Sequence, residues 1–277
     1  MLSGRAARRN GERACDRELV PEGDTIHHAA GRIRAVLERR VPEEIRTPHP
    51  RHKGDRWPER LAGRAVRAVD AHGKHLFLRF DGDLTLHSHL RMTGAWGVHR
   101  EGERWQRSER RAWLVLRVGG FDVVQFDGPV LELMPDHRTR SDPRLAALGP
   151  DVLGEDFDRG AFLRRLRADD PTRPIADALL DQRTVAGIGN LWKSEACFAA
   201  GIDPWRPLGD VRDEEALAVV AFAREHMRQS ARDGFIARPS SVYRRAGRPC
   251  PRCGTPIRQR GQWEDNRLTF WCEACQS

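Results

Sequence analysis

Hydrophobic residues follow two different spacings along the chain, and each spacing predicts its own kind of secondary structure. After Asp24 and Thr25, which are residue types that commonly begin helices, apolar side chains recur every three to four residues and predict a helix. Shorter runs of strand type follow, and Asp81-Gly82 and Gly119-Gly120 supply hairpin turns between neighbouring runs. These runs are 65–70, 75–80, 84–89, 112–118, 121–126 and 130–133. One leading helix and several short strands predict a β-sandwich or barrel of about 110 residues.

The pattern changes after Pro135, where the apolar spacing becomes helical. The segments with this spacing are 157–168, 175–182, 190–200 and 213–232. Prolines interrupt residues 42–62, which we expect to be mostly loop. The sequence therefore predicts an α+β multidomain fold, with an N-terminal helix and β-sandwich, a central helical domain and a C-terminal β-hairpin module. We place the boundaries at 1–19 (a disordered basic extension), 20–135, 136–240 and 241–277.

The charge balance indicates an acidic partner. The 277 residues include 48 Lys+Arg and 40 Asp+Glu, a formal net charge of +8, and nucleic acid is the commonest partner of such a chain. No apolar run approaches the roughly 18 residues needed to cross a bilayer, and the first nineteen residues lack the apolar core of a secretory signal. We therefore expect a cytoplasmic, nucleoid-associated protein with no membrane partner. Only Lys53, Lys74 and Lys193 are lysines, so arginine supplies nearly all of the positive charge.

Four of the six cysteines form two close pairs near the C-terminus. Cys250-Pro-Arg-Cys253 and Cys272-Glu-Ala-Cys275 are separated by eighteen residues, which matches the spacing of a tetrahedral four-cysteine zinc site. Four thiolates leave no open position for water, so the sequence predicts one structural Zn²⁺. The alternative is four unrelated thiols.

Several motifs, taken together and in order, resemble one family. They are Pro21-Glu22-Gly23-Asp24-Thr25, Gly73-Lys74-His75-Leu76, Ser88-His89-Leu90-Arg91-Met92-Thr93-Gly94, Asp181-Gln182 with Val185-Ala186-Gly187-Ile188-Gly189-Asn190, and Tyr243 through Cys275. From residue 21 to residue 276, the chain resembles the formamidopyrimidine-DNA glycosylase and endonuclease VIII family, and bacterial endonuclease VIII in particular. The resemblance implies a bifunctional enzyme with a β-sandwich domain, a helix–two-turn–helix domain and a zinc finger.

The resemblance implies four catalytic residues. Pro21 matches the proline whose secondary amine attacks C1′ of the damaged nucleotide and forms a Schiff base. Glu22 matches the acid that moves a proton to the sugar ring oxygen or the departing base. Lys74 is implied to bind phosphate and to donate a proton in β-elimination, and Arg267 matches the zinc-hairpin arginine assigned to δ-elimination.

Pro21 does not stand at the N-terminus of this sequence, and an amide nitrogen is not nucleophilic. Val20 is the residue that a GTG start codon would encode if translation were assigned too far upstream. We therefore expect residues 1–19 to be an artefact of the assigned start, with Pro21 exposed after removal of an initiator methionine. The alternative is a real basic extension that silences the amine.

The resemblance also implies the residues that contact damaged DNA. Met92 matches an apolar wedge that fills the space left by the extruded nucleotide, and Arg91 beside it matches a polar DNA contact. Asn190 is expected to bind phosphate together with backbone N–H groups at the start of a helix, and Tyr243 and Arg245 are expected to touch the DNA backbone. We expect the protein to act as a monomer.

The opening Pro-Glu-Gly-Asp-Thr resembles endonuclease VIII more than the purine-directed branch of the family. We therefore expect a base-excision-repair glycosylase and AP lyase acting on oxidised pyrimidines. Two alternatives remain, an 8-oxoguanine and formamidopyrimidine glycosylase of the same family, and a non-catalytic damaged-DNA-binding protein if Pro21 is blocked.

Overall fold

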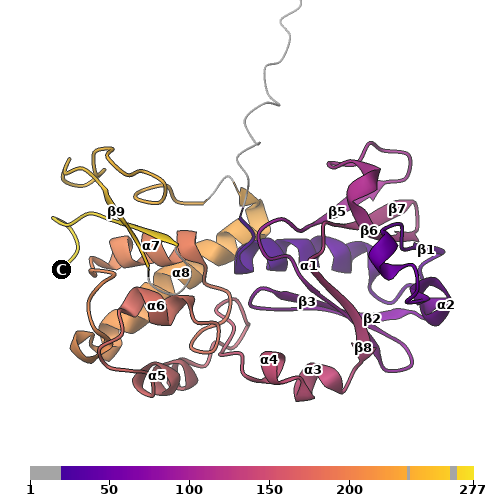
Figure 1. Ribbon diagram of the computed structural model, residues 1–277, viewed down its shortest axis with the longest axis horizontal. Helices are drawn as coiled ribbons and strands as arrows, with labels where there is room; N and C mark the ends of the chain where they lie inside the picture. Colours follow the sequence, from indigo (N-terminus) through magenta and orange to yellow (C-terminus); the bar gives the residue numbers. More distant parts are fainter. Residues whose placement is uncertain (1–19, 236–237, 263–266) are drawn as a thin grey trace, which may run out of the picture.

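The computed structural model describes residues 20–235, 238–262 and 267–277. The β-sandwich and the helical half form two lobes, and helix α1 (Gly23–Leu37) runs from the middle of the molecule into the sandwich lobe (Figure 1). The predicted helix is confirmed because Ile26, Ala30, Ile33 and Leu37 form its buried face. That helix packs against both lobes, since it contacts strands of the sandwich and helix α8 (Asp213–Asp233).

The sandwich consists of two four-stranded antiparallel sheets. One sheet has the order β2-β3-β4-β8, formed by Val66–His72, His75–Phe80, Leu84–His89 and Val130–Pro135. The other has the order β1-β6-β7-β5, formed by Glu44–Arg46, Ala112–Val118, Phe121–Phe126 and Ala95–Arg100. A continuous apolar core joins α1 to inward-facing residues of both sheets, including Leu78, Leu86 and Leu116.

The predicted strands are confirmed, but strand β5 was missed, as were short elements within the expected loop at 42–62. That segment contains β1, the 3-10 turn η1 (Pro50–His52) and α2 (Trp57–Leu61). Strand β5 contains Gly97, which weakens a strand pattern; a Cβ there would overlap Nε2 of His99 and lie 3.2 Å from the Phe126 ring. The strand is formed by its pairing with β7, which local spacing does not reveal.

The helical lobe contains α5 (Arg159–Arg167), α6 (Ile175–Leu180), α7 (Asn190–Ala200), α8 and the 3-10 turn η3 (Leu208–Asp210). Two short helices, α3 (Arg138–Ser141) and α4 (Pro143–Ala146), follow β8, and the 3-10 turn η2 (Glu109–Arg111) precedes β6 in the sandwich. The four predicted helices are confirmed as α5 to α8. Their core includes Phe162, Trp192 and Met227, all fully buried. None of the helices in the described part of the chain is long and apolar enough to cross a membrane.

The C-terminal module is an antiparallel hairpin of β9 (Arg258–Gly261) and β10 (Leu268–Trp271), as the sequence predicted. It packs on α7, because Phe198 of that helix joins Val242, Ile257 and Phe270 in a small core. Helix α7 therefore contributes to the core of the helical lobe and also to that of the C-terminal module.

Candidate active site and nucleic-acid interface

The start of α1 is anchored on the loop that precedes α7. The Gly23 N–H donates to the Gly187 carbonyl oxygen at 2.9 Å. The Glu22 carboxylate is 2 % exposed and accepts hydrogen bonds from the N–H groups of Leu191 at 2.8 Å and Trp192 at 3.4 Å. Glu22 therefore caps α7 from a distant part of the chain, with its charge at the positive end of the helix dipole.

Glycines allow this close approach. A Cβ atom on Gly189, which precedes the first residue of α7, would overlap the carboxyl carbon of Glu22. Gly73 has a φ of 56°, and a Cβ there would lie 2.7 Å from the Cβ of Ala186. The segments carrying Pro21–Glu22, Gly73–Lys74 and residues 186–190 are thus brought together at one point.

The environment of Glu22 raises the pKa of its carboxyl group. Burial is the main cause, and the charge of Asp24 acts in the same direction. The positive charge of Lys74 and the hydrogen bond from Leu191 oppose the shift. A carboxyl group that keeps its proton to higher pH is suited to general acid chemistry.

The strand register places Lys74 beside the predicted wedge. Lys74 lies in the turn between β2 and β3, and His75, the first residue of β3, pairs with His89, the last residue of β4. The turn after His89 carries Arg91 and Met92. Lys74 and the turn that carries Arg91 and Met92 therefore lie at the same end of the β3–β4 pair.

Met92 lies at the tip of a tight turn and is 64 % exposed, which is unusual for a large apolar side chain. The Gly94 N–H donates to the Leu90 carbonyl oxygen at 2.9 Å and closes the turn. Arg91 has a φ of 47°, and its N–H donates to Nδ1 of His89 at 3.1 Å. Burial, followed by the charge of Lys74, lowers the pKa of His89 to about 4, so its Nδ1 remains available as an acceptor at neutral pH.

A buried ion pair, which the sequence analysis missed, fixes α1 to the helical lobe. Asp24 is fully buried and receives two hydrogen bonds from Arg238, at 2.8 and 2.7 Å, and one from the Ser230 hydroxyl at 2.6 Å. Arg238 lies more than two hundred residues away in sequence, so local spacing carried no signal of this pairing.

Asn190 begins α7 as predicted, but its side chain faces the hairpin. Its Nδ2 donates to the Leu268 carbonyl oxygen at 2.9 Å, and its Oδ1 accepts from Lys193 at 2.7 Å. The expectation that nearby backbone N–H groups bind phosphate needs correction, because those of Leu191 and Trp192 are hydrogen-bonded to Glu22. Phosphate binding by the Asn190 amide stays a prediction.

Tyr243 lies close to Asn190 and Arg244, and burial raises the pKa of its hydroxyl. The N–H groups of Tyr243 and Val242 donate to Oε1 of the buried Glu195, at 2.8 and 2.9 Å, and that of Ser241 to its Oε2 at 3.0 Å. Glu195, which the sequence analysis did not identify, thus fixes the backbone of the segment that leads into the C-terminal module.

The remaining predicted residues of the module are Arg245 and Arg267, and both are half-buried. Arg245 is half-buried and donates to the Pro249 carbonyl oxygen at 3.3 Å. Arg267 immediately precedes β10, and its carbonyl oxygen accepts from the Gln262 N–H at 2.9 Å. Arg258 is exposed and pairs with Glu273.

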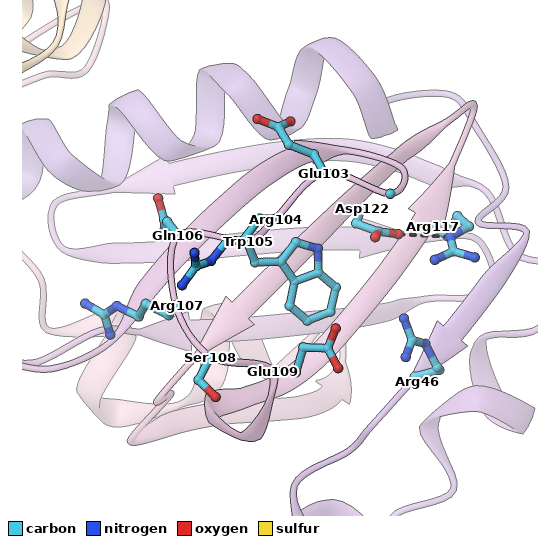
Figure 2. A pocket seen from close by; sticks show the side chains of 11 residues that line it. Arg46, Glu103, Arg104, Trp105, Gln106, Arg107, Ser108, Glu109, Arg117 and Asp122 are labelled. Atoms are coloured by element: carbon cyan, nitrogen blue, oxygen red, sulfur yellow. Dashed lines mark hydrogen bonds and ion pairs between the residues drawn. The ribbon is translucent and has the colours of Figure 1, made fainter. Parts of the chain in front are cut away.

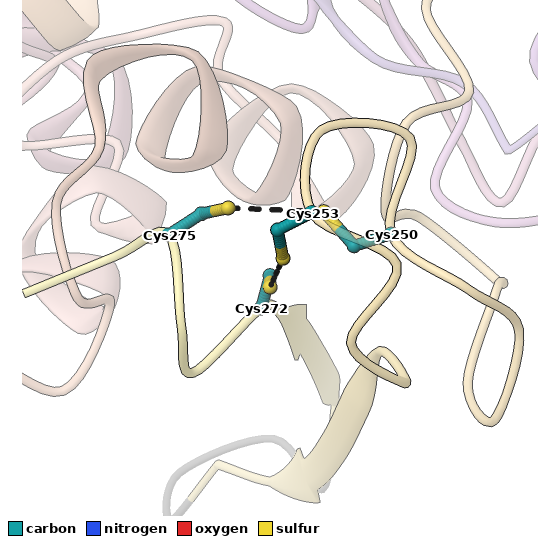
Figure 3. A group of neighbouring side chains, drawn as sticks. All are labelled: Cys250, Cys253, Cys272 and Cys275. Atoms are coloured by element: carbon teal, nitrogen blue, oxygen red, sulfur yellow. Dashed lines mark hydrogen bonds between the residues drawn. The ribbon is translucent and has the colours of Figure 1, made fainter.

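The four predicted cysteine ligands converge at the end of the module (Figure 3). All four sulfur atoms lie within 4.8 Å of one another, with 3.9 Å between Cys250 and Cys275 and 3.5 Å between Cys253 and Cys272. A tetrahedral Zn²⁺ with bonds of about 2.3 Å needs sulfur atoms about 3.8 Å apart. The cluster therefore has the size and ligand type of a metal site.

A separate polar pocket of about 700 Å³ lies on the β1-β6-β7-β5 sheet, around Trp105 (Figure 2). Its arginines are largely engaged, since Arg117 pairs with Asp122 and Arg107 with Asp127. None of the predicted site residues lines it.

Known proteins resemble this chain along most of its length. Residues 20–128 match the family described as formamidopyrimidine-DNA glycosylase N-terminal domain, and residues 148–239 match the formamidopyrimidine-DNA glycosylase H2TH domain. A probable endonuclease 8 2 of Streptomyces coelicolor is 39% identical over 93% of this chain and 94% of its own length. A protein named DNA-(apurinic or apyrimidinic site) lyase Nei2, of Mycolicibacterium smegmatis, is 38% identical over 93% of this chain and 99% of its own.

The fold also matches a solved structure. The wild-type Fpg (MutM) of Lactococcus lactis, crystallised with DNA containing N7-benzyl-Fapy-dG, superimposes with a TM-score of 0.79. The match covers 93% of this chain and 100% of that protein at 22% sequence identity, and so concerns the fold. Taken with the matches in sequence, it leads to the conclusion that the chain belongs to the formamidopyrimidine-DNA glycosylase and endonuclease 8 family.

Proposed function

We propose that the protein is a base-excision-repair DNA glycosylase with AP-lyase activity, in which Pro21 is the nucleophile. The observation that carries this proposal is the convergence of Pro21–Glu22, Gly73–Lys74 and the loop before α7 at one point. Pro21 is half-buried, so substrate can reach it, whereas Glu22 beside it is held rigidly by backbone N–H groups.

In the proposed reaction, the amine of Pro21 attacks C1′ of the damaged nucleotide as the bond from C1′ to the base breaks. The departing base keeps the electron pair of that bond. The nitrogen then loses its proton, and its lone pair forms the C=N bond of an iminium ion while the bond from C1′ to the sugar ring oxygen breaks and the ring opens. Glu22 supplies a proton to the sugar ring oxygen or to the base. The raised pKa of its carboxyl group supports this assignment.

Elimination of the strand ends follows from the iminium ion. Loss of a proton from C2′ expels the 3′ phosphate, and a second elimination expels the 5′ phosphate. We assign Lys74 to the first step and Arg267 to phosphate contact in the second. Met92 fills the space left by the extruded nucleotide, as its exposure at the tip of a closed turn supports. Arg91, Asn190, Tyr243 and Arg245 complete the proposed contacts with damaged DNA.

The proposed chemistry requires a free secondary amine at Pro21, because an amide nitrogen has no available lone pair. We therefore propose that the active form begins at Pro21, with residues 1–19 absent from it and an initiator methionine at position 20 removed. The domains proposed for the numbered chain are the catalytic sandwich at 20–135, the helix–two-turn–helix domain at 136–240 and the zinc finger at 241–277.

We propose that the metal is one structural Zn²⁺ held by Cys250, Cys253, Cys272 and Cys275. A closed four-thiolate shell stabilises a small module and leaves no position for catalysis. We further propose that the protein acts as a monomer in the cytoplasm, on DNA of the nucleoid.

We propose oxidised pyrimidines as the substrate class. The opening motif at residues 21–25 and relatives named endonuclease 8 support this choice. The continuous helix α8 over Asp213–Asp233 also leaves little length for the additional lesion-binding loop expected in the purine-directed branch. The competing substrate is 8-oxoguanine.

Borohydride trapping tests the function. Protein beginning at Pro21, full-length protein and a Pro21-start protein carrying Lys74→Leu are incubated with an abasic duplex and borohydride. We expect a covalent adduct from the Pro21-start protein, little from the full-length chain and a weakened yield from the variant. Absence of adduct from the Pro21-start protein contradicts the enzymatic function and favours a non-catalytic DNA-binding protein.

Two further measurements complete this test. Two defined duplexes distinguish the substrate classes, one containing thymine glycol and the other containing 8-oxoguanine opposite cytosine. Faster cleavage of the 8-oxoguanine duplex overturns the pyrimidine assignment. Mass spectrometry of the N-terminus of protein made in cells determines whether Pro21 is its first residue.

A further inference from the structure

Lys193 is a fully buried lysine between α7 and the C-terminal hairpin. Its Nζ atom donates to three oxygens, Oδ1 of Asn190 at 2.7 Å, Oε1 of Gln262 at 2.9 Å and Oγ1 of Thr269 at 2.6 Å. An ammonium group has three N–H donors, so the protonated side chain is saturated by these partners.

This arrangement is costly for a residue that only fills space. Burying a charge is unfavourable unless it is well compensated, and here all three hydrogen-bonding oxygens belong to neutral groups. Burial is accordingly the main reason that the pKa of Lys193 is lowered, to about 7. The positive end of the α7 dipole disfavours a cation there as well.

The ammonium group determines which way the Asn190 amide points. Because it can only donate, the atom that it meets must be the amide oxygen, and Nδ2 is turned toward the Leu268 carbonyl oxygen at 2.9 Å. The same group holds both sides of the hairpin next to Arg267. Thr269 lies two residues after Arg267, and the Gln262 N–H donates to the Arg267 carbonyl oxygen at 2.9 Å.

We propose that Lys193 is a positioning residue for DNA phosphate binding, whose ammonium group holds Asn190 and the hairpin in the arrangement that presents Asn190 and Arg267 to the DNA backbone. This inference rests on the function proposed above, because it assigns those two residues to phosphate contact.

The test compares Pro21-start proteins carrying Lys193→Met, Lys193→Arg and Thr269→Val, with Lys53→Met as the control. Lys53 is an exposed lysine in a turn of the sandwich lobe. Each protein is titrated with a duplex containing a tetrahydrofuran abasic analogue at several salt concentrations. Single-turnover cleavage of a natural abasic duplex then gives three separate quantities. They are the enzyme concentration at half-saturation, the cleavage rate at saturating enzyme, and the ratio of δ- to β-elimination product.

We expect Lys193→Met to weaken binding by about tenfold, as loss of a charged hydrogen-bond network does, and to lower the salt dependence by about one phosphate contact. The share of δ-elimination product should fall severalfold, while the single-turnover cleavage rate at saturating enzyme changes by less than about threefold. Lys193→Arg should restore part of the affinity, Thr269→Val should weaken it by about threefold, and Lys53→Met should match wild type.

The double variant Lys193→Met/Thr269→Val should bind no more weakly than Lys193→Met, because both changes break the same network. Wild-type affinity, salt dependence and product ratio in Lys193→Met overturn the inference. If Lys193→Met does not fold, Thr269→Val decides, and a Thr269→Val protein with wild-type values in all three measurements also overturns it. Absence of adduct from the wild-type protein would instead contradict the proposed function, whereas the binding measurements still test Lys193.

Discussion

Two buried ionisable side chains lie at the first turn of α7, and they are held in different ways. Glu22 directly precedes α1, and backbone N–H groups hold its carboxylate. The distance from the Leu191 nitrogen to Oε1 of Glu22 is 2.8 Å. Lys193 belongs to α7 itself and is fixed by side-chain oxygens, two of which come from the C-terminal hairpin. The helix dipole favours the carboxylate and disfavours the ammonium group.

The comparison explains what each region depends on. Backbone groups cannot change identity or rotate away, so the position of Glu22 depends on steric access, above all at Gly189. The position of Lys193 depends on the hairpin, and therefore on the cysteine cluster at its end. We expect substitutions beside Glu22 to change the rate of the chemical step, and substitutions beside Lys193 to change the affinity for DNA.

The largest expected effect is that of Glu22→Gln. Removing the proposed general acid should slow base excision by about 10²–10⁴-fold, while the amide oxygen can still accept from the Leu191 N–H and keep the fold. Single-turnover excision from a thymine glycol duplex measures the loss. Glu225→Gln, a change at an exposed glutamate of α8, is the control, and excision by Glu22→Gln at the wild-type rate would remove Glu22 from the chemistry.

Loss of the metal should affect the C-terminal hairpin, which holds Lys193 of α7. We expect Cys272→Ser, or chelation, to disorganise the hairpin and to remove the contacts of Asn190 and Arg267. At about 1.5 kcal/mol for each charged contact, affinity for the tetrahydrofuran duplex should fall by about 100-fold. Fluorescence anisotropy measures the affinity, and metal content is followed in parallel; unchanged affinity in metal-free protein would separate the hairpin from DNA binding.

Gly189→Ala should affect the Glu22 side selectively. The added Cβ overlaps the Glu22 carboxyl carbon and must displace it, so we expect excision at saturating enzyme to slow by about 10–100-fold. Gly31→Ala in α1 is a matched control, because a Cβ at Gly31 meets nothing within 4 Å. Equal rates for the two variants would show that the close approach at Gly189 has no functional importance.

The smallest effect is a difference in the sign of pH dependence. The folded-state pKa of Glu22 is raised, so the folded state holds more protons and stability falls as pH rises above the ordinary glutamate range. The pKa of Lys193 is lowered from 10.5 to about 7, so stability rises with pH between those values. The stability of Glu22→Gln relative to wild type should therefore rise from pH 5 to pH 8, and the stability of Lys193→Met relative to wild type should fall from pH 7 to pH 10.

Thermal unfolding of both variants across this pH range measures these opposite trends, with Glu225→Gln and Lys53→Met as controls. Parallel curves for Glu22→Gln and wild type would mean that the carboxyl group titrates normally. Parallel curves for Lys193→Met would mean the same for the ammonium group.

Local spacing was sufficient for the elements whose faces are clearly apolar. The strands at His75–Phe80 and Leu84–His89, and the start of α7 at Asn190, were predicted from the sequence. Strand β5 was not, because its residues reach a strand conformation only by pairing with β7. The cysteine spacing predicted a cluster that the structure assembles.

By itself the sequence determined the residue types of the site, the cysteine spacing and the order of the structural parts, because these follow from local chemistry and periodicity. Only the tertiary structure decided that the Glu22 carboxylate caps α7 and that Lys193 joins this helix to the hairpin. Both contacts link residues far apart in the chain, and their energies come from burial and from hydrogen-bond partners that are chosen only when the chain folds.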